Sequence, residues 1–393
     1  MKKKKLLFVM PHLKTGGITS AFVNLINSIH KVTWLDIEVL LFDADDRDKL
    51  PSNVNVLPQN PFLRILAVSQ EKIMRESRAA GFFRILFGGV AKFFGSAYAY
   101  KILFTLCRKV EKYDYAISFA QSGPNKSLYG GMNEFVLRKV VAAKKISFLH
   151  CDYKLAGIHS KSSAKNYKRF DCIAAVSQGV KDVFLSCMPE LENKVHVVHN
   201  CHQFSQISQA FLDSIIYSKD YFNILTVARI SEEKGIFRMG KIFSELKREG
   251  FAFRWHIVGS GTDKNMQKLT EMISEYSLEN DIILYNEQRN PYPFFVNADL
   301  FLLPSFHEAA PMVFTEAEYL KLPILTTETT STKEFIIDKQ NGIVCRNTDD
   351  DIYKQLKKIL VSPQIIYNIK QNLQQKPFPT NELAVQEFIR LIK

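Results

Sequence analysis

Short apolar runs alternate with helical stretches along most of the chain, and this alternation constrains the fold more than any other feature. A parallel strand needs a long crossover, usually a helix, before the next parallel strand, so the pattern predicts doubly wound parallel sheets. In the first half we expect strands near Leu6–Met10, Ile37–Phe42, Val54–Leu57, Tyr115–Phe119, Lys145–Leu149, Cys172–Ala175 and Val195–Val198. In the second half we expect strands near Phe222–Ala228, Arg254–Val258, Ile282–Tyr285, Leu300–Leu303, Pro323–Thr326 and Ile343–Cys345.

The length of the chain predicts two α/β domains, because 393 residues exceed the roughly 250–300 that one hydrophobic core usually serves. The stretch from Gln203 to Tyr221 has no strand pattern and is the expected connection between them. We therefore place the N-terminal domain at residues 1–205, the C-terminal domain at residues 206–380 and a terminal helix at residues 381–393.

Two glutamates follow the apolar run that ends at Leu303. Glu308 lies in the expected strand-to-helix loop, and Glu316 lies about two turns into the helix, which we expect to begin at Pro311. Between the two carboxylates lies the helix N-terminus, formed by Ala310, Pro311, Met312 and Val313. Such a site would hold an anionic ligand at the helix end while the carboxylates accept hydrogen bonds from sugar hydroxyls. The alternative is an ordinary surface loop followed by a solvated acidic helix.

Two cations follow the strand expected at residues 222–228, before a helix that runs from Gly235 to about Arg248. In open α/β sheets ligands collect at the carboxyl ends of strands, and Arg229 and Lys234 lie at such an end. A guanidinium can fork onto phosphate oxygens, and an ammonium adds a point charge. Two solvated surface cations are the alternative. Taken together, the two loops predict a clamp for a diphosphate that requires no metal.

These residues resemble the retaining glycosyltransferases of the GT-B architecture, in family 4, whose members carry two glutamates separated by seven residues. The resemblance is carried by residues 290–326, 227–235, 257–261, 334–336 and 341–344, and in the first half by residues 12–29, 146–153 and 175–177. It implies two Rossmann-like domains facing a central cleft, with the acceptor on the N-terminal side and the donor on the C-terminal side. Where the family usually has Gly and an aromatic residue after the first glutamate, this chain has Ala309 and Ala310, so the donor sugar stays open.

The resemblance implies transfer of a hexose from a nucleoside-diphosphate sugar, with a UDP-sugar expected, to a glycan or polyprenyl-linked acceptor in surface polysaccharide synthesis. No cofactor or metal is expected. Arg229 and Lys234 would neutralise the leaving diphosphate, Glu308 would hold hydroxyls of the donor sugar, and Glu316 would bind the ribose. The resemblance adds His150, near the sugar on the acceptor side, and the donor-site glycines Gly16, Gly17 and Gly259.

Two other classes of protein stay open. A sugar-nucleotide epimerase of the same architecture would bind the same donor and need no acceptor. A non-catalytic nucleic-acid-binding protein is suggested by the isoelectric point near 9.2. The basic excess is local, however, and no RNP, zinc-knuckle or helix-turn-helix pattern accompanies it, so no nucleic-acid partner is expected.

The basic charge is concentrated in residues 61–112, which contain ten Lys or Arg and three Glu, a net +7 of the chain's +12. Phenylalanines and tyrosines are interleaved with these charges, as in segments that lie in the headgroup layer of an anionic membrane. The alternative is a pair of amphipathic helices whose aromatic face packs on the first sheet. No uncharged apolar segment approaches the ~20 residues needed to cross a bilayer.

Six scattered cysteines without a CxxC pair are typical of reduced thiols in an intracellular protein. The apolar run after the basic start is too short for a signal peptide. We therefore expect a cytoplasmic protein, attached to the inner face of the cell membrane through residues 61–112. A cluster of His196, His199, Cys201 and His202 resembles a metal site. Strand alternation sends His196 and His199 to opposite faces, so we expect no zinc there.

Overall fold

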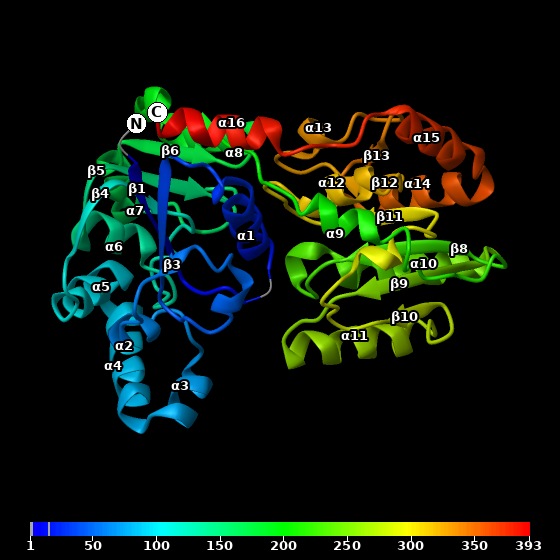
Figure 1. Cartoon of the computed structure of the whole chain (residues 1–393). Helices are drawn as coiled ribbons and strands as arrows, with labels where there is room; N and C mark the ends of the chain where they lie inside the picture. The colour runs from blue at the N-terminus through cyan, green and yellow to red at the C-terminus, as the bar shows by residue number, and fades with distance from the viewer. Residues whose placement is uncertain (1–2, 15) are drawn as a thin grey trace. The chain divides into compact units, whose positions relative to one another are not determined.

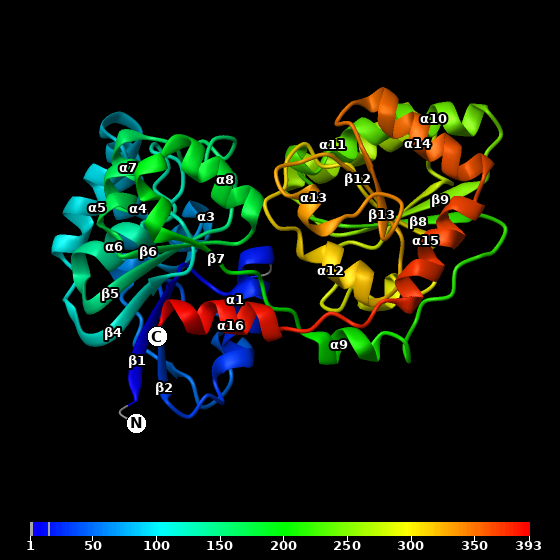
Figure 2. The same cartoon turned by 90° about the horizontal axis from the view of Figure 1, so that it is seen from above.

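The structure is a computed structural model, and it describes residues 3–14 and 16–393. The chain divides into two compact units. The first contains the chain up to His202 together with Asn381–Lys393, and the second is Gln203–Thr380. Each unit is a parallel sheet with helices on both faces, as Figure 1 and Figure 2 show.

In the described part of the first unit the sheet has seven strands in the order β3-β2-β1-β4-β5-β6-β7. The strands are β1 (Lys4–Met10), β2 (Leu35–Leu41), β3 (Asn55–Val56), β4 (Val110–Ser118), β5 (Val140–Leu149), β6 (Cys172–Ala175) and β7 (Val195–Val197). The helices are α1 (Gly17–Ile29), α2 (Pro61–Arg64), α3 (Gln70–Glu76), α4 (Arg78–Phe94), α5 (Ser96–Thr105), α6 (Met132–Lys139), α7 (Lys161–Arg169), α8 (Gln178–Cys187) and α16 (Glu382–Leu391).

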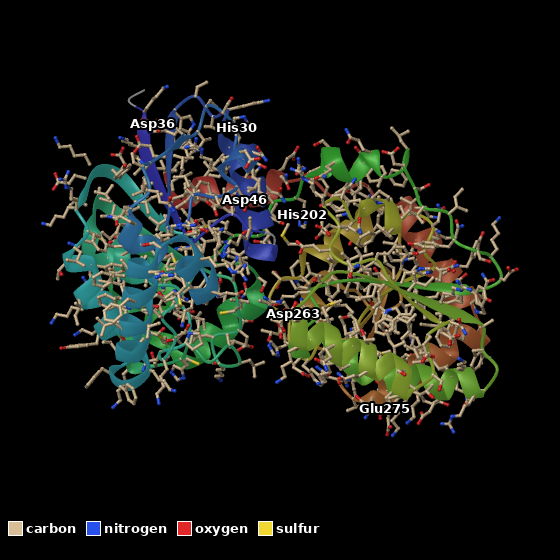
Figure 3. The ribbon with its side chains drawn as sticks, turned by 90° about the horizontal axis from the view of Figure 1, so that it is seen from below. His30, Asp36, Asp46, His202, Asp263 and Glu275 are labelled. Carbon is tan, nitrogen blue, oxygen red and sulfur yellow. The ribbon has the colours of Figure 1, made fainter. Side chains whose placement is uncertain are left out.

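The sheet of the second unit has six strands in the order β10-β9-β8-β11-β12-β13. The strands are β8 (Phe222–Val227), β9 (Phe253–Val258), β10 (Ile282–Leu284), β11 (Leu300–Leu303), β12 (Ile324–Thr327) and β13 (Gly342–Cys345). The helices are α9 (Phe204–Gln209), α10 (Met239–Arg248), α11 (Asp263–Glu275), α12 (Met312–Tyr319), α13 (Thr332–Phe335), α14 (Asp349–Val361) and α15 (Gln364–Gln375). Figure 3 labels Asp263 and Glu275 at the two ends of α11.

The predicted fold class is confirmed, because every strand expected from the sequence has a counterpart in these two parallel sheets. The largest differences are at β4 and β5, which begin at Val110 and Val140 rather than at Tyr115 and Lys145. Their added ends carry exposed charged residues, and the two strands still pair there at Val110 with Val140 and at Tyr113 with Ala142. A search for apolar runs misses such ends, because backbone pairing there continues beyond the buried core.

Both sheets contain a point at which the order of the strands reverses. It lies between β1 and β4 in the first unit and between β8 and β11 in the second. Connections leave these two neighbours in opposite directions, and ligands of open α/β sheets bind at the carboxyl ends of the strands at such a point. In the second unit the loops after β8 and β11 are the two loops that the sequence predicted to hold a diphosphate.

The terminal helix α16 packs on the sheet of the first unit. The ring of Phe388 stacks on Phe8 of β1, with 5.8 Å between ring centroids. The ammonium of Lys4 donates a 2.6 Å hydrogen bond to the carbonyl of Ile392. The final residues therefore complete the core of the unit in which the chain begins.

The segment expected to connect the domains is part of the second unit rather than a free connection. It forms α9, and the side chains of Ile207, Ala210 and Tyr217 are buried in the core of that unit. The hydroxyl of Tyr217 donates a 2.8 Å hydrogen bond to the carbonyl of Phe294. The segment lacks a strand pattern because it is a short helix followed by an ordered loop.

Candidate active site

Two glycines allow the loops at the carboxyl edge of the second sheet to approach closely. Gly235 has a φ of +67°, and a Cβ at this position would lie 2.0 Å from the carbonyl oxygen of Pro304. Gly259 has a φ of +152°, and a Cβ there would lie 1.9 Å from the carbonyl oxygen of Ala228. A side chain is excluded at both positions, so the loops after β8, β9 and β11 meet backbone against backbone.

The two loops at the strand reversal are joined by an ion pair. The Nζ atom of Lys234 lies 2.6 Å from Oε1 of Glu308, and the hydroxyl of Ser305 donates to the same oxygen at 2.6 Å. The Glu308 side chain is 9% exposed and that of Lys234 is 21% exposed. Shielding from water strengthens this pair relative to an exposed one. The structure thus brings together two residues that the sequence could only place in separate loops.

Arg229 lies at the same edge in a different environment. Its guanidinium is 2.5 Å from Oε1 of Glu233, and its side chain is 70% exposed. An exposed pair of this kind contributes little stability and opens easily. Both cations of the expected clamp therefore have a carboxylate partner. The Lys234–Glu308 pair is the stronger of the two, because it is less exposed than the Arg229–Glu233 pair.

Glu316 is the fifth residue of α12, so it lies just over one turn into the helix and not about two turns as predicted. Pro311 is also not the first helical residue. It has an extended conformation (φ −69°, ψ 114°) immediately before Met312, and its ring has no polar atom to cap the first N–H groups. The first N–H groups of α12 therefore have no side-chain cap, although the N–H of Phe314 donates to the carbonyl of Pro311 at 3.2 Å.

The carboxyl of Glu316 is buried beneath this helix end. Burial raises its pKa to about 7, against the opposing effect of the Tyr292 hydroxyl, which donates to Oε1 over 3.4 Å. A 3.4 Å hydrogen bond satisfies a carboxylate poorly. Glu316 can therefore accept hydrogen bonds from two neighbouring hydroxyls of a ligand such as a ribose.

Arg238 and Asn347 also belong to this edge, and neither was predicted from the sequence. The guanidinium of Arg238 donates to Oδ1 of Asn347 at 2.7 Å, and the Arg238 side chain is only 6% exposed. The available signal was a third cation close to Lys234. The sequence gave no indication that Arg238 is buried, because its partner Asn347 is more than a hundred residues away.

In the first unit, the residues singled out from the sequence lie at the carboxyl ends of β1 and β5. Gly16 and Gly17 begin α1 after β1, and His150 follows β5. The imidazole of His150 packs on Phe119 and Phe148, with ring centroids 4.9 Å and 5.8 Å away. Burial lowers the pKa of His150 to about 4, so its ring is neutral at pH 7. Within the described residues its Nε2, which is shielded from solvent, has no hydrogen-bond partner.

The histidine cluster near β7 has a structural explanation. His199 Nδ1 lies 2.9 Å from Oε2 of Glu387, on α16. The carboxyl of Glu387 also accepts from the backbone N–H of His199. Across residues 3–14 and 16–393, no group of three or more His, Cys, Asp or Glu side chains is arranged to hold a metal ion. His199 therefore helps to fix the terminal helix.

Comparison with known proteins identifies the region that carries this site. Residues 211–376 match the family model described as "Glycosyl transferases group 1". An uncharacterized glycosyltransferase of Methanocaldococcus jannaschii, MJ1059, is 28% identical over 243 residues, 59% of this chain and 59% of the relative. The capsular polysaccharide biosynthesis glycosyltransferase CapM of Staphylococcus aureus is 23% identical over 213 residues, 51% of this chain and 55% of the relative. The chain thus spans between half and three fifths of the length of these curated relatives.

Solved structures resemble the fold along nearly the whole chain. The Anabaena protein Alr3699/HepE in complex with UDP and glucose has a TM-score of 0.68 at 16% identity and covers 99% of both chains. TarM has a TM-score of 0.69 at 12% identity and also covers 99% of both chains. Residues 211–376 therefore resemble a glycosyl transferases group 1 domain, and the fold of the chain is that of its GT-B structural neighbours.

Proposed function

We propose that this protein is a retaining, metal-independent glycosyltransferase of family 4. It transfers a hexose from a UDP-sugar to a glycan or polyprenyl-linked acceptor in surface polysaccharide synthesis. The observation that carries the proposal is the Lys234–Glu308 ion pair in the loops at the strand reversal, just before α12, which carries the buried Glu316. The name of CapM, which refers to capsular polysaccharide, and the Anabaena structure with UDP and glucose support the acceptor and donor classes.

The donor diphosphate would lie against Lys234, Arg229 and the first N–H groups of α12. Both cations are paired with carboxylates, so a bound diphosphate would replace or share these partners. Lys234 then stabilises the charge that develops on the leaving group, and Glu308 becomes free to accept hydrogen bonds from sugar hydroxyls. Glu316 holds the ribose. The small side chains of Ala309 and Ala310 leave space beside the sugar.

The chemistry would take place on one face of the sugar. The bond from the anomeric carbon to the diphosphate oxygen breaks, and a bond to the acceptor oxygen forms on the same side. The leaving phosphate accepts the acceptor's proton, so no protein base is required. As the resemblance implies, the neutral His150 would contact the donor sugar through Nε2, and Gly16 and Gly17 would belong to the donor site.

Thermal unfolding with nucleotides tests the donor class. UDP and UDP-hexoses should raise the melting temperature more than GDP, ADP or their sugars, since a ligand at 100 times its Kd stabilises by about 2.7 kcal/mol. Release of UDP that rises many-fold over slow hydrolysis when an acceptor is added excludes an epimerase, and the anomeric configuration of the product, read by NMR, tests retention. The proposal fails if no nucleotide changes the melting temperature, or if the protein instead binds generic DNA with a strong salt dependence.

We also propose that the protein attaches to an anionic membrane through α4 and α5. Their outward surface exposes apolar side chains, including Phe82 at 64%, Phe93 at 80%, Phe94 at 75% and Tyr98 at 52%. Phe82, Leu86 and Phe93 recur at helical spacing along one face of α4. The alternative that the aromatic face packs on the sheet is therefore wrong for these residues, although Phe87 and Phe104 are buried.

Cations accompany this apolar face of Phe82, Leu86 and Phe93. Arg78 and Lys92 on α4 and Lys101 on α5 are exposed. Arg84 is not suited to a membrane contact, because its guanidinium is half-buried and donates to the carbonyl of Ile65. Apolar side chains that enter the boundary between headgroups and acyl chains, together with cations near anionic headgroups, are the chemistry of an interfacial helix. No helix in the described residues is long and apolar enough to span a bilayer.

Flotation with vesicles tests the attachment. Two variants should be released from vesicles that contain phosphatidylserine. The first carries Arg78→Glu, Lys92→Glu and Lys101→Glu. The second carries Phe82→Ser and Phe93→Ser. The matched control carries Leu212→Ser and Ile216→Ser in the second unit. These two residues are 84% and 87% exposed. Salt should weaken binding, since attraction to the surface is screened within about 10 Å at 0.1 M. Unchanged binding in both folded variants would refute the attachment.

A further inference from the structure

One asparagine connects three of the loops at the carboxyl edge of the second sheet. Asn347 lies two residues after β13. Its Oδ1 accepts a 2.7 Å hydrogen bond from Arg238, which follows the loop after β8. Its Nδ2 donates to the carbonyls of Ser305 at 3.2 Å and Phe306 at 2.9 Å, in the loop after β11. Because an amide has one acceptor and one donor end, the bond from Arg238 orients the donor end toward these carbonyls.

The guanidinium of Arg238 is directed at the same short segment. It lies 4.5 Å from the ring centroid of Phe306, and its Nη1 lies 3.4 Å from the carbonyl oxygen of Pro304. Its Nε donates to Oδ1 of Asp349 at 2.7 Å. A guanidinium that is 6% exposed needs such partners, because an unpaired buried charge is strongly unfavourable.

The segment held in this way carries the site. Ser305 donates to the carboxylate of Glu308, and the backbone N–H of Phe306 donates to the carbonyl of Glu233 at 2.9 Å. Glu233 immediately precedes Lys234. The backbone between Pro304 and Phe306 therefore sets the relative placement of the two partners in the Lys234–Glu308 pair.

We propose that Arg238 and Asn347 are positioning residues for glycosyl transfer. Neither is assigned a contact with the donor. They act by holding residues 304–306 so that Glu308 and Lys234 keep their geometry when the diphosphate displaces their ion pair. Replacing Arg238 and Asn347 removes the side-chain hydrogen bonds to the carbonyls of residues 304–306 in the loop after β11. The catalytic part of this inference rests on the proposed function, whereas the holding of the loop does not.

Hydrogen exchange tests the holding of the loop without any substrate. In Asn347→Ala and Arg238→Lys, the protection of amides in residues 304–310 should fall by roughly 10-fold or more, while the rest of the second unit keeps its protection. Asn372→Ala and Arg248→Lys, at exposed positions on α15 and α10, serve as matched controls. Unchanged protection of residues 304–310 in both variants would overturn the inference.

Slow hydrolysis of UDP-glucose, UDP-galactose and UDP-N-acetylglucosamine, followed by release of UDP, tests the effect on the reaction. Turnover should fall roughly 100-fold, because small misplacements of reacting groups have effects of this size, while the Kd for UDP changes less than about 3-fold. In a Glu308→Gln background, Asn347→Ala should add little, since both changes disable the same group.

The outcomes are distinguishable. A loosened loop with unchanged turnover, or full additivity with Glu308→Gln, would show that the two residues are structural only and would overturn the proposal. A loss of turnover matched by equal losses in UDP binding and melting temperature would overturn it as well. If the wild-type protein neither binds UDP nor hydrolyses any of the three sugars, the proposed function fails, and the exchange measurement still decides whether Arg238 and Asn347 hold the loop.

Discussion

Replacing Glu316 by Gln should make the second unit more stable and at the same time weaken UDP binding. The carboxyl of Glu316 is buried, and burial raises its pKa from 4.5 to about 7, against the opposing Tyr292 hydroxyl. Ionising this group inside the protein is therefore unfavourable. A glutamine of the same shape avoids that cost, and it keeps an oxygen to accept from Tyr292.

The size of the effect depends on pH in a defined direction. Between pH 4.5 and about 7 the folded unit keeps the proton of Glu316 while the unfolded chain releases it. The free energy of unfolding of the wild type therefore falls as pH rises through this window. At about 1.4 kcal/mol for each tenfold change in proton affinity, the full penalty is about 3 kcal/mol. Glu316→Gln should gain about that much at pH 8 and less than about 1 kcal/mol at pH 5.

Differential scanning calorimetry can measure this gain in the transition of the second unit. For a unit of this size, 1 kcal/mol corresponds to roughly 2–4 °C, so the variant should melt about 6–12 °C higher than the wild type at pH 8. At pH 5 the two melting temperatures should nearly coincide. Glu275→Gln, an exposed position at the end of α11, is the matched control and should change the stability by less than about 0.5 kcal/mol.

Nucleotide binding completes the test. Ribose hydroxyls donate more strongly to a carboxylate than to a neutral acid, so UDP should bind wild type more tightly above pH 7 than below it. In Glu316→Gln this pH dependence should disappear, and the affinity should fall by roughly 1–2 kcal/mol. A variant less stable than wild type at pH 8 would refute the argument from burial. Equal UDP affinity in both proteins at pH 8 would refute the ribose role.

Further predictions concern the clamp, the ribose and a glycine. Lys234→Ala should reduce turnover at least ~100-fold. Arg229→Ala should reduce it somewhat less, because Arg229 is exposed. Near-normal turnover in both variants would show that the loop is only a solvated surface. Wild type should bind 2′-deoxy-UDP more weakly than UDP by calorimetry, and Glu316→Gln should bind both about equally; a wild type that does not distinguish them contradicts a ribose contact. Gly259→Ala should destabilise the second unit by several degrees in a thermal melt, since its Cβ would meet the Ala228 carbonyl, whereas Gly17→Ala, with nothing within 4 Å of its Cβ, should melt like wild type.

The sequence by itself determined the two-sheet fold and the local character of each loop. Leu300–Leu303 is apolar at every position and is buried throughout, as a parallel strand covered on both faces must be. Lys234, Glu308 and Glu316 were found because each lies next to such a strand or at the start of the following helix. These features depend on residues close in the chain, so the order of residue types is sufficient to predict them.

The tertiary structure alone decided which of these residues meet. The Lys234–Glu308 pair requires β8 and β11 to be neighbours, and the Arg238–Asn347 bond joins residues 109 positions apart. It also decided that Phe82 and Phe93 of α4 face outward while Phe87 faces the core. Strand adjacency and helix rotation are set by the packing of the whole unit, and burial, which raises the pKa of Glu316, exists only once that packing is complete.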